Sequence, residues 1–117
     1  MTDIDTKEEL RQQCVAIARF LEQEDFGKNE DGEDYTVYDY LAAEVYDTQY
    51  VINANRDYLG ARVLVAGGEP YIWINTSRNH IEGYWGTDEV SIYYREDNLG
   101  LGDALEERAI SLFNLKR

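Results

Sequence analysis

The spacing of apolar residues changes twice along the chain, and this change constrains the fold more than any other feature. Apolar residues recur every three to four positions over residues 6–24 and 37–47, a spacing typical of amphipathic helices. Between residues 50 and 94 they mostly alternate with polar residues, which is the period of half-buried strands. Helical spacing returns after residue 103. The 117 residues suit one domain, because a chain of this length builds one hydrophobic core.

The N-terminal part is predicted to contain two helices joined by a loop. Thr6 and Glu9 form a capping-box pattern that predicts the start of the first helix. Thr36 and Asp39 predict the start of the second helix in the same way. Residues 25–34 contain two glycines and little apolar content, so they are predicted to form a loop. The predicted buried stripes are Leu10, Cys14, Ile17, Ala18 and Leu21 in the first helix and Tyr38, Leu41, Ala42 and Val45 in the second.

The middle of the chain is predicted to form an antiparallel sheet. Short turns such as Gly67-Gly68-Glu69-Pro70 separate its strands and favour a meander. Asp103 and Glu106 predict the start of a C-terminal helix. The strands are expected at residues 50–53, 61–65, 71–75 and 81–85, with 89–94 as a fifth strand or an extended edge, and Leu105, Ala109 and Leu112 are expected to face inward from the last helix. The predicted class is therefore α+β, a single domain with a four- to five-stranded antiparallel meander covered by N-terminal helices and a C-terminal helix.

Residues that form common catalytic and metal sites are scarce. The only cysteine, Cys14, lies on an apolar stripe, and the only histidine, His80, is expected in an exposed turn. This leaves no nucleophile with an adjacent base and too few ligands for zinc. The run Asn29-x-Asp31-Gly32 resembles the middle of a calcium loop, but Gly27 and Tyr38 would fall where carboxylates are required. We therefore expect no enzyme activity, no metal and no cofactor.

The chain is expected to be cytoplasmic. A single cysteine cannot form an internal disulfide, which favours a reducing compartment. No segment approaches the roughly 20 apolar residues of a membrane span. The first five residues are acidic and lack the basic and apolar regions of a signal peptide. These features predict a protein that does not enter or cross a membrane.

The strongest functional clue is an uneven excess of negative charge. The net charge is −13, and residues 1–47 contain 14 acids and 4 bases, whereas residues 48–117 contain 10 acids and 7 bases. Such a chain repels nucleic acid and acidic membranes and attracts basic surfaces. The simplest alternative is that the acidity only keeps the protein soluble.

Closely spaced carboxylates on a rigid surface resemble the phosphates of duplex DNA. Such a surface can compete for the basic groove of a protein that binds nucleic acid, with a gain from counterion release and electrostatic steering. Helices are expected to fix the spacing of these acids. The predicted partner-binding residues are Glu22, Glu24, Asp25, Glu30, Asp31, Glu33, Asp34, Asp39, Glu44 and Asp47.

Two strings in the predicted sheet carry a resemblance to known sequences. The run Gly67-Gly68-Glu69-Pro70-Tyr71-Ile72-Trp73-Ile74-Asn75-Thr76 is followed by Tyr84-Trp85-Gly86-Thr87-Asp88. Residues 35–115 in this respect resemble small acidic proteins carried on mobile elements of gut bacteria, which share a G-G-x-P-x-I-x-[IV]-[DN]-T run and a Y-W-x-x-D segment. The resemblance names no activity, but proteins of that setting often counter host defence, including restriction and CRISPR nucleases.

These observations give a leading hypothesis and two alternatives. The leading hypothesis is a non-enzymatic anti-CRISPR or antirestriction inhibitor that occludes the basic groove of a host-defence nuclease. The first alternative is a protein-binding or regulatory module that uses an aromatic-rich sheet surface, since the chain has ten tyrosines. Core positions are expected for Trp73 and Trp85, and the aromatic excess mildly favours a homodimer. A small hydrolase built on paired carboxylates remains the third hypothesis.

Overall fold

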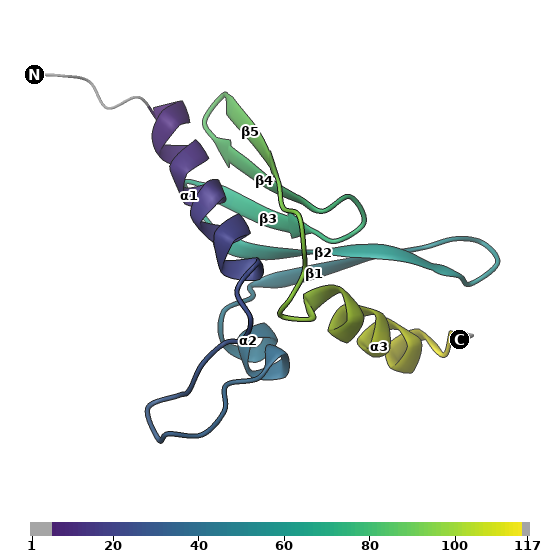
Figure 1. The fold of residues 1–117 in the computed structure, drawn as a ribbon. Coiled ribbons are helices and arrows are strands. Elements are labelled where there is room, and N and C mark those ends of the chain that lie inside the picture. The colour runs from purple at the N-terminus through teal and green to yellow at the C-terminus, as the bar shows by residue number, and fades with distance from the viewer. Residues whose placement is uncertain (1–5, 116–117) are drawn as a thin grey trace, which may run out of the picture.

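The computed structural model describes residues 6–115, which form three helices and one five-stranded sheet (Figure 1). In chain order the elements are α1 (Thr6–Leu21), α2 (Val37–Ala43), β1 (Asp47–Ile52), β2 (Tyr58–Gly67), β3 (Tyr71–Asn75), β4 (His80–Trp85), β5 (Asp88–Tyr93) and α3 (Leu101–Phe113). The predicted α+β class is confirmed.

The sheet is an antiparallel meander with the strand order β1-β2-β3-β4-β5. Every strand pairs with the next one along the chain because short turns join them. The segment that was expected as a fifth strand or an edge is a full strand, whose residues pair with β4 from His80↔Tyr93 to Trp85↔Asp88. His80 is therefore the first residue of β4, and its predicted place in a turn is wrong.

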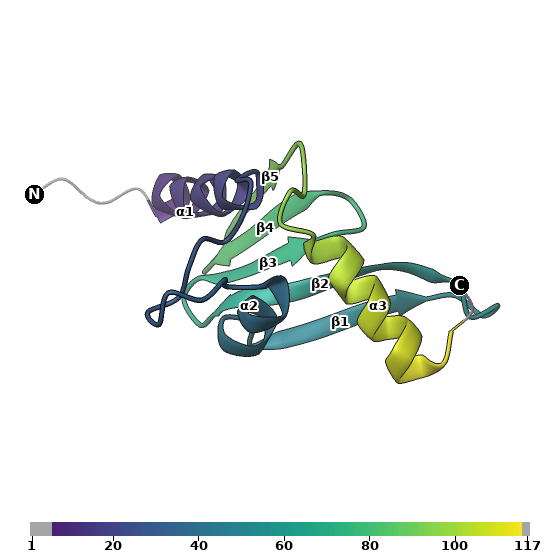
Figure 2. The same cartoon turned by 60° about the horizontal axis from the view of Figure 1, so that its bottom comes forward.

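Both long helices lie on the same face of the sheet (Figures 1 and 2). Helix α1 packs against β4 and β5, whereas α3 packs against β2, and the short α2 touches α3. Alternate residues of the strands point toward these helices, among them Val63, Ile74 and Ile81, which are fully buried. The opposite face of the sheet is left without a helix among residues 6–115, and we call it the open face.

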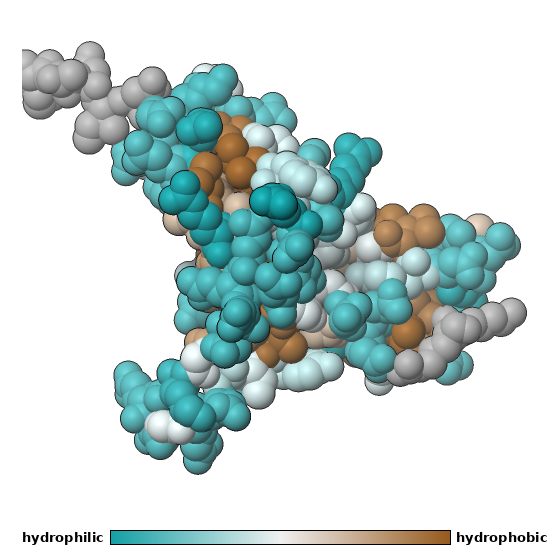
Figure 3. Space-filling model, viewed as in Figure 1, coloured by the Kyte–Doolittle hydropathy of each residue, from teal (hydrophilic) through white to brown (hydrophobic). Residues whose placement is uncertain are grey.

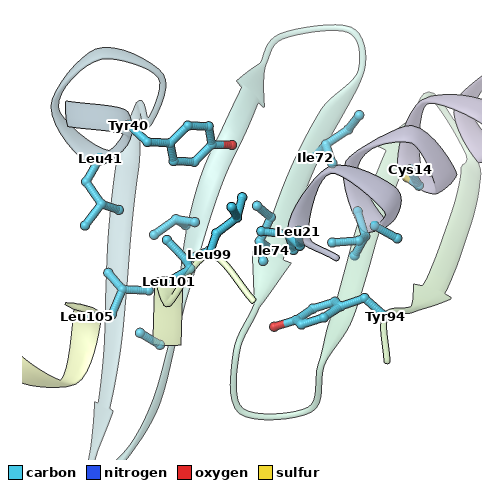
Figure 4. Close-up of a cluster of buried hydrophobic side chains, with 14 of the residues drawn as sticks. Cys14, Leu21, Tyr40, Leu41, Ile72, Ile74, Tyr94, Leu99, Leu101 and Leu105 are labelled. Carbon is cyan, nitrogen blue, oxygen red and sulfur yellow. The ribbon is translucent and has the colours of Figure 1, made fainter. Parts of the chain in front are cut away.

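The hydrophobic core lies between the helices and the sheet (Figure 4). The buried residues of helix α1 are Leu10, Cys14, Ala18 and Leu21, all of which belong to its predicted buried stripe. Cys14 is fully buried, which confirms its core position, and burial raises the pKa of its thiol to about 11. It faces Gly83, where an added Cβ would lie 2.7 Å from the Cys14 Sγ atom. Glycine at this position lets α1 approach the sheet closely.

The second helix begins as predicted and ends earlier. The hydroxyl of Thr36 accepts a hydrogen bond from the Asp39 amide, and the Asp39 carboxylate accepts one from the Thr36 amide. The helix ends at Ala43, not at residue 47, because β1 already begins at Asp47. Its buried residues are Tyr40 and Leu41, whereas Tyr38 and Ala42 of the predicted stripe are exposed.

The ends of α1 and α3 also differ from the prediction. Helix α1 ends at Leu21, three residues before the expected end. Helix α3 starts at Leu101 because the Asp97 carboxylate accepts hydrogen bonds from the amides of Leu101 and Gly102, at 3.0 and 2.6 Å. Within α3, Leu105 and Ala109 are buried as expected, but Leu112 is exposed.

Candidate functional site

The acids that follow α1 lie on an ordered loop, residues 24–35, which we call the acidic hairpin. Its two arms are joined by backbone hydrogen bonds from Tyr35 to Gly27, at 3.0 Å, and from Asn29 to Glu33, at 2.8 Å. It projects from the body of the protein below α2 (Figure 1), and its surface is hydrophilic (Figure 3). The hairpin therefore presents its charges away from the core.

Side chains close to the tip fix the backbone of the acidic hairpin. The side-chain oxygen of Asn29 accepts hydrogen bonds from the amides of Asp31 and Glu33, at 2.9 and 3.0 Å. The ammonium group of Lys28 lies 2.6 Å from a carboxylate oxygen of Asp34 on the other arm. Both ends of this ion pair are exposed, so it contributes little stability by itself. The Asn29 bonds are the firmer constraint on the path of the chain.

The predicted acidic residues lie on or near this hairpin, but helices do not space them as expected. Of the ten, Asp39 alone lies within a described helix, whereas seven follow the end of α1. Nine are exposed and Glu22 is half-buried. Their spacing is set by the hairpin and by the short connections on either side of α2, so this part of the prediction is wrong.

Half of these carboxylates already have a partner within the protein. Glu22 accepts a hydrogen bond from the Arg95 amide. In the same way Asp25 accepts one from the Gly27 amide, Asp39 from the Thr36 amide and Asp47 from the Thr48 amide. Asp34 pairs with Lys28. Among residues 6–115, no hydrogen bond or ion pair engages the carboxylates of Glu24, Glu30, Asp31, Glu33 and Glu44. These five are available to a partner.

Four aromatic rings attach the acidic hairpin to the body, and we call them the aromatic cluster. Phe20 comes from α1, Phe26 and Tyr35 from the two arms of the hairpin, and Tyr40 from α2. The rings of Phe20, Phe26 and Tyr40 lie 5.4–5.6 Å apart, and Tyr35 lies 5.7 Å from Phe26. Such edge and tilted contacts are favourable geometries for aromatic pairs. Sequence reasoning missed these residues, although aromatic residues on both flanks of the acidic run were a signal.

A cavity of about 550 Å³ opens between the acidic hairpin and α2. It is lined by the aromatic cluster together with Lys28, Asn29, Glu30 and Glu44. Burial and then the negative charge of Glu44 raise the pKa of Tyr40 to about 12. The pKa of Tyr35 is raised for the same reasons, with a further contribution from Asp39. The cavity thus combines apolar rings with a negative potential.

The described residues provide no arrangement for nucleophilic or metal chemistry of the kinds considered above. No group of three or more potential metal ligands occurs within residues 6–115. The side-chain oxygen of Asn29, which belonged to the calcium-like run, is occupied by backbone amides. His80 makes an edge-to-face contact with the Tyr93 ring on the open face, whereas Cys14 faces Gly83 on the helix-covered face, so the sheet separates them. In that same part of the chain no helix is both long and apolar enough to cross a membrane.

The open face of the sheet carries a polar and aromatic network. The Arg62 guanidinium lies 4.1 Å from the Trp73 ring centre and 3.4 Å from a Glu82 carboxylate oxygen. Arg62 also donates a hydrogen bond to Gln49 at 2.7 Å, and Asn75 donates one to Glu82 at 3.2 Å. Trp73 therefore lies outside the core, contrary to expectation. Trp85, in contrast, packs against the core as expected.

Comparisons of the chain with protein-family models, with curated proteins and with solved structures found no match. The functional argument therefore depends on the two surfaces described above, the acidic hairpin with its cavity and the open face.

Proposed function

We propose that this protein is a non-enzymatic inhibitor that occupies the basic nucleic-acid-binding groove of a host-defence nuclease, as an anti-CRISPR or antirestriction protein. Its partner-binding surface comprises the acidic hairpin and the acids around α2. The observation that carries the proposal is the acidic hairpin itself, whose backbone is fixed by hydrogen bonds. It holds the exposed carboxylates of Glu24, Glu30, Asp31 and Glu33, which have no partner among residues 6–115.

The distribution of charge between the two layers supports this proposal. Residues 6–46 and 95–115, which form the helices and the acidic hairpin, contain 16 acids and 6 bases. Residues 47–94, which form the sheet, contain 6 acids and 3 bases. A basic groove is therefore attracted more strongly to the helix layer and the acidic hairpin than to the sheet.

A fixed hairpin also binds at a lower entropic cost than a disordered acidic tail. Association costs free energy for each loop that has to be ordered at the interface. The backbone bonds of the acidic hairpin exist before any partner arrives. Neutralisation of its carboxylates by lysine and arginine releases the salt ions bound in the groove, so binding should weaken as salt increases.

The proposal is tested with a variant that neutralises three acids of the hairpin, Glu24→Gln, Asp31→Asn and Glu33→Gln. Asp34 is left intact because it holds Lys28, and Glu30 because it lines the cavity. The control variant, Glu69→Gln, Glu89→Gln and Glu96→Gln, changes the net charge equally at exposed positions outside residues 22–47. Wild type and variants serve as bait in a lysate of a gut bacterium that carries restriction and CRISPR systems. Each pull-down is done at about 50 mM and at about 300 mM salt, because electrostatic binding weakens strongly over such a range.

We expect the wild type and the control to retain a nuclease that duplex DNA and high salt displace. They should inhibit its cleavage of DNA, whereas the hairpin variant should lose roughly tenfold or more in inhibition at low salt. Equal inhibition by all three proteins at both salt concentrations would exclude the acidic hairpin as the inhibitory surface. Recovery of partners that ignore both DNA and salt would count against the proposal as a whole.

A second candidate function uses the open face, because both long helices cover the other side of the sheet. Trp73, half-buried under Arg62, and the exposed Tyr93 suit a protein-binding or regulatory module or a homodimer. A Trp73→Ala variant separates the two functions. It should abolish binding or dimerisation in sedimentation experiments under this alternative, and leave inhibition unchanged under the first.

A further inference from the structure

The cavity beneath the acidic hairpin has the composition of a site for an organic cation. Its aromatic rings form an apolar wall, in which Tyr40 is buried and Phe20, Phe26 and Tyr35 remain partly accessible. Its volume of about 550 Å³ lies within the range of roughly 300–1,000 Å³ that is common for ligand pockets. The faces of aromatic rings attract cations.

The charges around the cavity favour a positive ligand over a neutral one. Among the described residues that line the cavity, Lys28 alone is cationic, and its ammonium group is paired with Asp34 at 2.6 Å. Glu30 and Glu44 line the cavity and form no ion pair with any described residue. Glu44 lies close enough to Tyr35 and Tyr40 for its charge to help raise the pKa of both phenols.

We propose that this cavity binds an arginine side chain of the protein partner, with the guanidinium against the aromatic cluster and its N–H groups directed to Glu44 and Glu30. Arginine fits better than lysine because its planar, weakly hydrated guanidinium stacks on aromatic rings and donates to carboxylates. The partner's identity rests on the proposed function, since grooves that bind nucleic acid are rich in arginine. The site itself depends only on the cavity.

The test measures binding of a minimal probe, N-acetyl-arginine amide, to the whole protein by two-dimensional NMR of the aromatic rings. Two further probes are the corresponding lysine amide and the uncharged norleucine amide. For a ligand of this size we expect a dissociation constant on the order of millimolar. The resonances of Phe20, Phe26, Tyr35 and Tyr40 should shift in a saturable way, with norleucine amide at least about tenfold weaker and lysine amide between the two.

Two single variants separate the cavity from general attraction between opposite charges. Glu44→Gln removes a carboxylate of the cavity, and Glu33→Gln removes one at the hairpin tip outside it. Both sites are exposed, so neither change should unfold the protein, which the unperturbed amide spectrum verifies. We expect Glu44→Gln to weaken arginine amide binding at least fivefold, and Glu33→Gln by less than about twofold.

Three results would overturn this inference: no saturable shift of the aromatic resonances, equal affinity for norleucine amide, or equal weakening by the two variants. The proposed function fails separately, in the inhibition assay with the hairpin variant, which leaves Glu30 and Glu44 intact. An arginine site without nuclease inhibition would point to a basic partner of another kind.

Discussion

Gly83 lies at a point where α1 packs closely against the sheet. A Cβ atom there would lie 2.7 Å from the Cys14 Sγ atom and 2.8 Å from a methyl carbon of Leu10. We expect Gly83→Ala to destabilise the protein by roughly 1–3 kcal/mol, because the core must shift to admit the methyl group. Urea denaturation followed by circular dichroism measures the change.

A double mutant tests whether the Cys14 sulfur is the atom that makes Gly83→Ala unfavourable. Cys14→Ala removes the sulfur atom, so Gly83→Ala should cost at least about 0.5 kcal/mol less in that background than in the wild type. Gly68→Ala is the matched control, because an added Cβ there meets no atom within 4 Å. Additive effects of the two core substitutions would show that the sulfur contact is not what makes glycine necessary.

Cys14 also makes a prediction about alkaline pH. Burial raises the pKa of its thiol to about 11, above the ordinary value of about 8.5. Well below pH 8.5 the thiol is protonated in both states, and stability does not depend on its titration. Above it, the unfolded chain releases the proton while the folded chain keeps it, so the free energy of unfolding falls until the pH passes the folded pKa.

The size of this effect follows from the difference in pKa. Between pH 8 and 10 the wild type should lose roughly 1–2 kcal/mol more than the Cys14→Ala variant. Tyrosines with raised pKa, such as Tyr40, add their own losses at higher pH in both proteins, so the range stops at pH 10. Parallel stability curves for the two proteins would contradict the buried thiol's contribution.

The two tryptophans show what residue-level reasoning from sequence can and cannot do. Trp73 lies between Ile72 and Ile74, and strict alternation already places it on the face opposite theirs. Composition favours burial of any tryptophan, and this preference led to the wrong expectation for Trp73. Aromatic residues on both flanks of the acidic run were visible in the sequence, but their contacts were not. Contact between Phe20 and Phe26 depends on the path of the intervening loop, which no periodicity encodes.

Among the elements, α3 shows how a distant side chain fixes a helix boundary. The predicted start at Asp103 relied on a capping pattern within three residues, whereas the structure uses Asp97, four positions before Leu101. We expect Asp97→Ala to destabilise the protein by about 1–2 kcal/mol, since two helix amides lose their acceptor. Asp97→Asn should cost less, because it keeps one oxygen.

Asp103→Asn provides the control for this prediction in urea denaturation. The Asp103 side chain is exposed in the first turn of α3. Like Asp97, it lies near the N-terminus of the helix, where a negative charge is favourable. We expect a change below about 0.5 kcal/mol, as that effect alone predicts. Similar losses for Asp97→Ala and Asp103→Asn would mean that charge near the helix end, and not the two hydrogen bonds, stabilises α3.

The acidic hairpin makes the corresponding prediction for a loop. Asn29→Ala removes the acceptor for the amides of Asp31 and Glu33. The tip of the hairpin should then open locally, which amide hydrogen exchange and limited proteolysis detect as faster exchange and cleavage within residues 28–34. Global stability should change little, because the hairpin tip contributes no residue to the core. Unchanged exchange in the variant would show that the other backbone bonds suffice.

At the scale of the whole molecule, the fold class could be predicted from the sequence, but the covered face of the sheet and the place of the acids could not. The class and the meander could be predicted because the apolar period and the short turns determine them directly. The helix-covered face could not be assigned in detail, since β3 is apolar on both faces, with Trp73 on one and Ile74 on the other. The net charge could be read from the sequence, but the position of the acids on a folded hairpin, and not on helices, could not. That hairpin depends on contacts of Asn29 and of the aromatic cluster, which form only in the folded chain.

The last prediction concerns stability and charge together. A chain with a net charge of −13 repels itself, so removal of exposed acids should not destabilise it unless they hold structure. The hairpin variant, Glu24→Gln, Asp31→Asn and Glu33→Gln, should therefore keep or gain up to about 1 kcal/mol at low salt. Thermal unfolding in about 20 mM NaCl, where the screening length is long, and in about 500 mM NaCl, where it is short, measures the gain. The gain should vanish at the higher concentration.

The comparison with Glu69→Gln, Glu89→Gln and Glu96→Gln decides what these acids are for. If both variants are as stable as the wild type and only the hairpin variant loses inhibition, the carboxylates act on a partner and not on the fold. If the hairpin variant unfolds more easily at both salt concentrations, its acids stabilise the loop, and its loss of inhibition would no longer identify a contact surface. The stability measurement therefore decides whether a loss of inhibition identifies a contact surface or a change in the fold.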